Sequence, residues 1–150
     1  MRFIQLLILI ILMCAISGCS SISAKITAAA NINPDINGQP SPVAISIFEL
    51  RDASAFERAD FFTLYSNATN GLGHALLYQK SLVVTPGQTL TVDIPYVQGA
   101  HFVGYIAAYR NVKHVVWRGK VALYPKTLSG QTIRVVLSNR GLVIKAGDHR

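Results

Sequence analysis

Cysteine is scarce in this sequence. The 150 residues contain two, Cys14 and Cys19, and both lie near the N-terminus. The chain after Cys19 therefore has no disulfide to stabilise it, and its stability must come from the burial of Val, Ile, Leu, Phe and Tyr side chains. The same scarcity leaves no free thiol there to serve as a metal ligand or nucleophile.

Spacings typical of catalytic sites are also missing. The four histidines share no H-x-H, H-x-x-x-H or H-E-x-x-H spacing, and there is no G-x-S-x-G sequence around a serine. The segment Gly71–His74 is too short to form a phosphate-binding loop. Acidic residues gather at Asp52, Glu57 and Asp60, where we expect them to cap and solvate helices. The sequence predicts that the protein is not an enzyme and binds no metal.

The longest apolar run is too short for a membrane span. Phe3–Ala15 is apolar except for Gln5, whereas a spanning helix needs about 20 apolar residues. Arg2 precedes the run and small residues follow it, which is the pattern of a secretory signal. We expect residues 1–18 to be a cleaved signal peptide, residues 19–24 a lipidated tether, and residues 25–150 a single domain.

The exit from this signal ends in a cysteine. Ile16-Ser17-Gly18-Cys19 resembles the lipobox of bacterial lipoproteins, in which the thiol is lipidated and the chain is cut before it. The alternative is an ordinary signal peptide, but the Ala-x-Ala-like exit is absent. Ser20, rather than Asp, follows the cysteine, which by resemblance to the sorting rules of enterobacterial lipoproteins favours the outer membrane. The resemblance implies a covalent lipid on Cys19, no other cofactor, and a domain that faces the periplasm.

Charge is distributed unevenly along the chain. Residues 19–94 carry four Lys/Arg and six Asp/Glu, a net charge of −2, whereas residues 95–150 carry nine Lys/Arg and one acid, Asp148, a net charge of +8. This asymmetry is typical of a surface for an anionic partner, such as a lipid headgroup, a glycan or an acidic protein. We expect no nucleic-acid partner, because nucleic acid does not fit a periplasmic location. A solvated basic face that keeps the domain soluble explains it equally well.

Alternating apolar and polar residues predict about eight strands separated by closely spaced turn signals. Thr89–Pro95 is the clearest, with Leu90, Val92 and Ile94 predicted to point inward. The pattern favours an all-β, antiparallel two-sheet sandwich or barrel. Residues 52–65 differ, because Ser54 and Glu57 have capping-box spacing and an i, i+3, i+4 apolar pattern follows, so we expect a short helical insertion. The other predicted strands are Ala24–Asn31, Val43–Leu50, Gln79–Val84, His101–Tyr109, Val115–Leu123, Gln131–Asn139 and Leu142–Ala146.

The segment between the first two predicted strands is the best candidate for a binding loop. Residues 33–42 hold three prolines, two asparagines and one glycine, residues that form tight turns and lose little entropy on binding. Ile36 is apolar within this polar loop. It either anchors in a partner's pocket or folds back onto the core, and the sequence does not decide between the two.

Six segments follow one another in a recognisable order along the chain. They are Asn31–Asp35, Gly38–Val43, Ile47–Leu50, Phe56 with Ala59–Leu64, Tyr105–Arg110 and Trp117-Arg118. Their order resembles that of the TssJ family, the outer-membrane lipoproteins of type VI secretion. With the lipobox, the resemblance spans nearly the whole chain.

This resemblance implies a transthyretin-like β-sandwich and a non-enzymatic role. It implies a lipoprotein that binds the periplasmic C-terminal region of the inner-membrane component TssM, within the TssJ–TssL–TssM membrane complex. In that family the loop between the first two strands contacts TssM. The corresponding residues are Asn33, Pro34, Asp35, Ile36, Asn37, Gly38, Gln39 and Pro40.

The family resemblance leaves the basic C-terminal half without a role. An alternative from another class is therefore a periplasmic lipoprotein that binds an anionic envelope glycan through this half, with Arg118 and Lys120 among the contacts. An envelope hydrolase is a third possibility, and the missing nucleophile and metal spacings argue against it.

Overall fold

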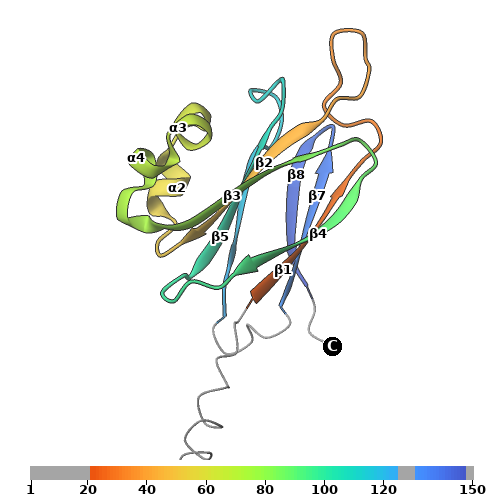
Figure 1. The fold of residues 1–150 in the computed structure, drawn as a ribbon. Helices are drawn as coiled ribbons and strands as arrows, with labels where there is room; N and C mark the ends of the chain where they lie inside the picture. The colour runs from red at the N-terminus through yellow and green to blue at the C-terminus, as the bar shows by residue number, and fades with distance from the viewer. Residues whose placement is uncertain (1–20, 125–130, 148–150) are drawn as a thin grey trace, which may run out of the picture.

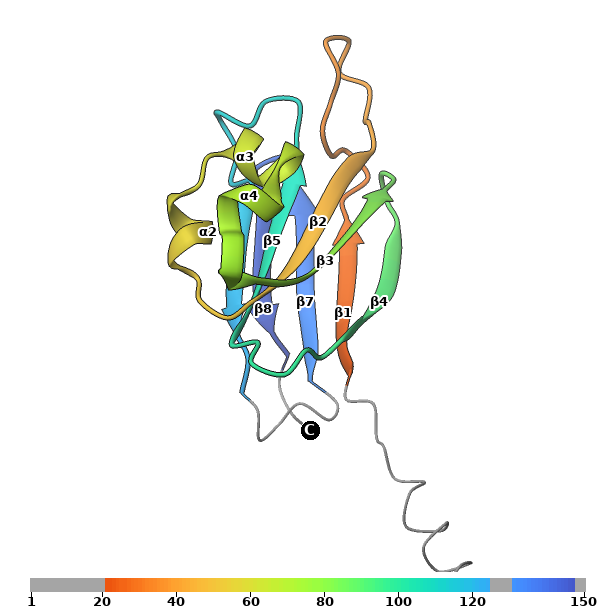
Figure 2. The same cartoon turned by 60° about the vertical axis from the view of Figure 1, so that its left-hand side comes forward.

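The computed structural model describes residues 21–124 and 131–147 of the chain. Its eight strands form two four-stranded sheets that face each other (Figures 1 and 2). The predicted two-sheet sandwich of about eight strands is confirmed. The predicted lipid site Cys19 and the predicted signal, residues 1–18, lie outside the described residues.

Sheet A has the strand order β4-β1-β7-β8. β1 pairs antiparallel with β4 but parallel with β7, so this sheet is mixed rather than wholly antiparallel as predicted. Most of the chain separates β1 from β7, and no turn between them signals the direction of pairing. The strands are β4 (Thr89–Pro95), β1 (Ser21–Ala28), β7 (Thr132–Ser138) and β8 (Gly141–Ala146).

β1 begins earlier than the sequence suggested. Ile22 and Ala24 are fully buried in the core, and Ser21 already pairs with Pro95. Most of the segment 19–24, which we expected to be a tether, is therefore strand. The domain begins two residues after the predicted lipid site, Cys19.

Sheet B has the order β3-β2-β5-β6, with every neighbouring pair antiparallel. Its central strand β2 is buried on both faces: Ile45 and Ile47 point between the sheets, while Phe48 and Leu50 point to the outside. This explains why β2 is apolar at nearly every position. The strands are β3 (Leu76–Val84), β2 (Val43–Leu50), β5 (Phe102–Ala108) and β6 (Arg118–Ala122).

The main core lies between the sheets and is built from the inward-facing residues of both. The predicted inward set of β4 holds, because Val92 and Ile94 are buried and Leu90 packs against the core. Tyr105 is fully buried there, and burial raises the pKa of its phenol. Other members include Ile22, Ile26, Ile45, Ile47, Val103, Ile133, Val135 and Leu137.

The helices cover the outer face of sheet B (Figures 1 and 2). They are α2 (Ser54–Arg58), α3 (Phe61–Ser66) and α4 (Ala68–Leu72), followed by a 3-10 turn at Gly73–Ala75. The helical region thus extends beyond the predicted 52–65, because Ala68–Leu72 forms the additional helix α4. Within the described residues, no helix has the length and apolarity that crossing a membrane requires.

The predicted capping box at Ser54 does not form. Ala53 is the N-cap of α2 and gives no side-chain hydrogen bond; the Asp52 carboxylate instead accepts from the Ser54 backbone N–H. Asp60 caps the next helix, because its Oδ1 accepts from the Thr63 N–H at 2.9 Å. These hydrogen bonds hold the pKa of both carboxyls below the usual value, so both residues serve the helix starts.

A second apolar cluster lies between these helices and sheet B. The Phe56 ring packs against the Phe48 ring at a centroid distance of 5.9 Å. Gly104 makes room for it, since a Cβ at that position would come within 2.9 Å of the Phe56 ring. The helices thereby bury a sheet face that would otherwise expose Phe48, Leu50 and Ile106.

Candidate partner-binding loop

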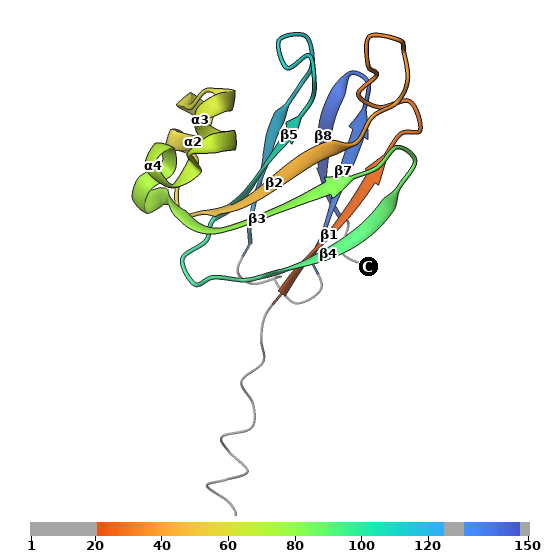
Figure 3. The same cartoon turned by 45° about the horizontal axis from the view of Figure 1, so that its top comes forward.

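The segment between β1 and β2 protrudes from one end of the sandwich (Figures 2 and 3). β1 runs toward that end from Ser21, which lies at the opposite end. At about 3.3 Å per residue, the eight residues of β1 span roughly 25 Å. The start of the domain and the predicted binding loop are therefore separated by the length of the sandwich.

The base of the loop is fixed by Ile32 and Asn33, both buried. Asn33 has a φ of +48°, a conformation that Asn tolerates better than most residues. Its Oδ1 accepts from the Arg110 backbone N–H, and its Nδ2 donates to the Pro42 carbonyl, both at 2.8 Å. One side chain thus joins the two arms of the loop to the segment after β5.

The tip of the loop is organised by Asp35. Its Oδ1 accepts from the backbone N–H groups of Asn37 at 2.8 Å and Gln39 at 2.9 Å. The backbone adds two bonds, from the Asp35 N–H to the Gln39 carbonyl at 2.8 Å and from the Gly38 N–H to the Asp35 carbonyl at 3.0 Å. Gly38 has a φ of +77°, which favours glycine. The tip is therefore preorganised for binding.

Ile36 lies at this tip and is 100 % exposed. The structure excludes the alternative that it folds back onto the core. Because the hydrogen bonds of Asp35 fix the turn around it, the side chain is held away from the domain with no contact that shields it from water. Exposing a large aliphatic side chain on an ordered turn is the arrangement expected of an anchor for an apolar pocket.

A hollow of about 270 Å³ lies beside the loop base. The segment after β5 contributes Arg110 and His114 to its lining, and Asn33 and Pro34 come from the loop. Tyr109 also lines it, and burial raises the pKa of this tyrosine to about 12, so its phenol is neutral at physiological pH. The hollow therefore places hydrogen-bonding groups and the Arg110 cation at the base of the loop.

The structure separates the predicted loop residues into two groups. Asn33 is buried and acts as a brace, whereas the others are exposed or half-buried around the tip. Sequence reasoning missed Arg110 and His114, because their proximity to the loop comes from the β5–β6 connection and has no local sequence signal. The group around the tip consists of Pro34, Asp35, Ile36, Asn37, Gly38, Gln39 and Pro40.

The basic C-terminal half does not form one face. Arg118 donates from Nη1 to the carbonyls of Phe56 at 3.2 Å and Ala59 at 2.9 Å, and Lys120 forms an ion pair with Glu57 at 3.0 Å. Both cations, which the glycan hypothesis had named, therefore hold α2 against β6. Of the other described cations in this half, Arg110 lines the hollow beside the loop base, and Arg134 and Lys145 lie on the outer face of sheet A.

Among residues 21–124 and 131–147, no three His, Cys, Asp or Glu side chains come close enough together to hold a metal ion. Among the described carboxyls, Glu49 of β2 is the one that is fully buried. It lies elsewhere in the sandwich, and its Oε1 accepts from the Val97 N–H at 3.3 Å. Burial raises the pKa of Glu49 to about 7, against the opposing effect of that hydrogen bond.

Comparison with known families gives one match. The family model described as "Type VI secretion lipoprotein, VasD, EvfM, TssJ" matches residues 20–140. Among curated protein sequences, none matches this chain.

Solved structures share the fold over most of the chain. The lipoprotein TssJ1 from Pseudomonas aeruginosa matches with a TM-score of 0.81 and 26 % identity, covering 88 % of this chain and 99 % of that one. Lip from Serratia marcescens, described as a membrane-bound component of the type VI secretion system, has a TM-score of 0.78 and 28 % identity, covering 86 % and 98 %. A structure described as the TssM C-terminal domain from EAEC contains a chain with a TM-score of 0.69 and 26 % identity, covering 83 % and 99 %.

Proposed function

The chain belongs to the type VI secretion lipoprotein family, and we propose that it anchors the secretion membrane complex to the outer membrane. In this proposal the lipid on Cys19 inserts in that membrane, and the loop at residues 33–40 binds the periplasmic C-terminal region of TssM. The protein then acts as an adaptor rather than as an enzyme.

The separation of the two ends supports this role. The domain begins at Ser21, two residues after Cys19, and the loop lies at the other end of β1. An adaptor needs its attachment points apart so that the loop stays free for the partner while the lipid inserts in the bilayer. The core along β1 is continuous, with Ile22, Ala24 and Ile26 all fully buried, so the separation is rigid.

The full exposure of Ile36 on an ordered turn is the main observation that supports this loop as the partner-binding site. A preorganised tip loses little entropy on docking, and a single apolar anchor in a pocket can supply much of an interface's affinity. The match to a chain in the structure described as the TssM C-terminal domain supports TssM as the partner.

Substitution at the tip tests the loop. We expect Ile36→Asp to weaken binding of the purified TssM periplasmic region about tenfold or more, measured by calorimetric titration, because a charge would enter an apolar pocket. Val83→Asp makes the same chemical change at another exposed residue, 60 % exposed on β3, and should leave the affinity unchanged. Equal affinities for Ile36→Asp and the parent protein would move the partner site away from this loop.

Removing the lipid site tests the anchor. Cys19→Ser should release the domain from the membrane fraction and abolish secretion, while its circular dichroism spectrum and affinity for TssM stay as in the parent protein. Normal assembly and secretion by this variant would refute the anchoring role.

A further inference from the structure

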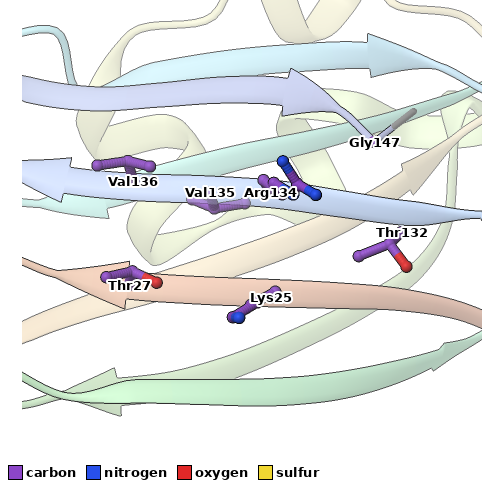
Figure 4. Close-up of a pocket in the computed structure, with 7 residues that line it drawn as sticks. All are labelled: Lys25, Thr27, Thr132, Arg134, Val135, Val136 and Gly147. Atoms are coloured by element: carbon purple, nitrogen blue, oxygen red, sulfur yellow. The ribbon is translucent and has the colours of Figure 1, made fainter.

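The outer face of sheet A carries a row of cations across three neighbouring strands. Lys25 of β1 is paired in register with Arg134 of β7, and Arg134 is paired with Lys145 of β8. All three side chains are exposed, and in Figure 4 Lys25 and Arg134 lie on adjacent strands. Like charges at directly opposed positions of a sheet destabilise it, so this row carries a cost that an anionic ligand would offset.

No carboxylate within the described residues neutralises this row. The ion pair between Lys120 and Glu57 lies on the other sheet, and the acidic residue on this face is Asp93 of β4. Asp93 accepts a hydrogen bond from the Ser23 hydroxyl at 3.3 Å and is paired in register with Ser23, not with Lys25. The row therefore presents uncompensated positive charge to solvent.

The two cations of the central strands border a shallow hollow of about 430 Å³. Its lining includes the side chains of Lys25, Arg134, Thr27 and Thr132 (Figure 4). Two cations and two hydroxyls around an open depression offer the hydrogen-bond donors and charge that a phosphate group takes.

The position of the row relative to the start of the domain indicates which anion is available. Lys25 is four residues after Ser21 and six after Cys19, so an extended backbone puts it within about 20 Å of the lipid site. We propose that this face, through Lys25, Arg134 and Lys145, contacts the anionic phospholipid headgroups of the membrane that holds the lipid on Cys19. This inference rests on the proposed anchor.

The contact would orient the domain. A flexible lipid linkage fixes position but not direction, whereas an electrostatic contact on one face restricts the directions in which the loop at residues 33–40 points. Each cation near an anionic membrane surface strengthens the association about fivefold, the equivalent of about 1 kcal/mol. Three cations are therefore enough to bias the orientation of a domain that is already tethered.

Lysine footprinting on vesicles tests this contact. The lipidated protein is reconstituted in vesicles of phosphatidylcholine alone and of phosphatidylcholine with phosphatidylglycerol, and amine acylation is followed by mass spectrometry. We expect Lys25 and Lys145 to react several-fold more slowly on the anionic vesicles, and Lys113, beside the binding loop, to react equally on both. Roughly 1 M salt, which shortens the Debye length to about 3 Å, should remove the difference.

Matched charge reversals provide the control. Lys25→Glu with Arg134→Glu should restore rapid acylation of Lys145 on anionic vesicles, whereas Lys113→Glu with Arg140→Glu, an equal change in charge at the other end, should not. Equal labelling of Lys25 and Lys145 on both vesicle types would overturn the proposal. So would their protection, without vesicles, by the TssM periplasmic region or by peptidoglycan fragments.

The failure of the anchor would look different. A protein without lipid on Cys19 would not float with phosphatidylcholine vesicles at all. An anchored protein whose sheet A face does not contact the headgroups would float with both vesicle types and show no difference in labelling.

Discussion

The outer faces of the two sheets differ in composition and in what covers them. The outer face of sheet B is apolar and covered by α2, α3 and α4, which bury Phe48, Leu50 and Ile106. None of the described helices lies over the outer face of sheet A (Figure 3). That face presents Lys25, Arg134 and other exposed residues of its strands. One face contributes to the fold, and the other is left available for contacts outside the domain.

The difference can be read from the strands themselves. β2 is apolar at nearly every position because it is buried on both faces, whereas β7 alternates strictly, with Ile133, Val135 and Leu137 buried and Arg134 and Val136 exposed. A continuous apolar strand requires a cover, and an alternating one does not. The helical insertion is therefore the structural consequence of the composition of β2.

Truncation of Phe56 should destabilise the packing of the helices against the outer face of sheet B. We expect Phe56→Ala to lower the free energy of unfolding by about 3–5 kcal/mol, because the ring fills the space between Phe48 and Gly104. Val136→Ala on the bare face, where the side chain is 41 % exposed, should cost less than about 1 kcal/mol. Equilibrium urea unfolding gives both values, and similar losses at the two sites would show that the faces do not differ as described.

The pH dependence of stability tests the layer between the two sheets, because the carboxyl of Glu49 is buried there. Its pKa is raised from 4.5 to about 7 by burial, so between these values the folded protein holds a proton that the unfolded chain releases. Stability should therefore fall as the pH rises from 4.5 to 7, by at most about 3 kcal/mol, and level off above. Urea unfolding at several pH values should show the slope in the parent protein and a flatter profile in Glu49→Gln.

The smallest expected effect concerns the bare face alone. Lys25→Thr removes one member of a like-charged pair with Arg134, so we expect it to stabilise the domain by about 0.2–1 kcal/mol at low salt. Lys113→Thr, in the loop after β5, should change little. Thermal unfolding at low and high salt measures both; a gain that persists unchanged in high salt would mean that charge repulsion is not its cause.

Local sequence patterns predicted the bounds of individual strands but not how distant segments pair. β2 and β4 have the predicted bounds, because period-two alternation or continuous apolarity begins and ends there at Pro and turn residues. The parallel pairing of β1 with β7 was not predicted, because it depends on contacts between distant segments. α4 was missed as well, since its two buried residues, Ala68 and Leu72, are too few to display a helical period.

The candidate site was likewise predicted only in part, in its location but not in its geometry. The turn-forming composition drew attention to residues 33–42 and to Ile36 within them, and the family resemblance indicated residues 33–40 as the binding loop. Whether Ile36 points outward depends on hydrogen bonds from Asn37 and Gln39 to the Asp35 carboxylate, and residue types alone do not specify that geometry. The role of Asn33 as a brace was likewise hidden, because its partner Arg110 is far away in the sequence.

The pairing of β1 has a mechanical consequence. If the lipid pulls on the start of β1 and a bound partner pulls on the loop that follows it, the force runs along this single strand. β1 is an interior strand, held by seven residue pairs with β4 and six with β7. Pulling along its axis loads these pairs together in shear rather than opening them one at a time. The domain is thus arranged to resist extension between the two proposed attachment points.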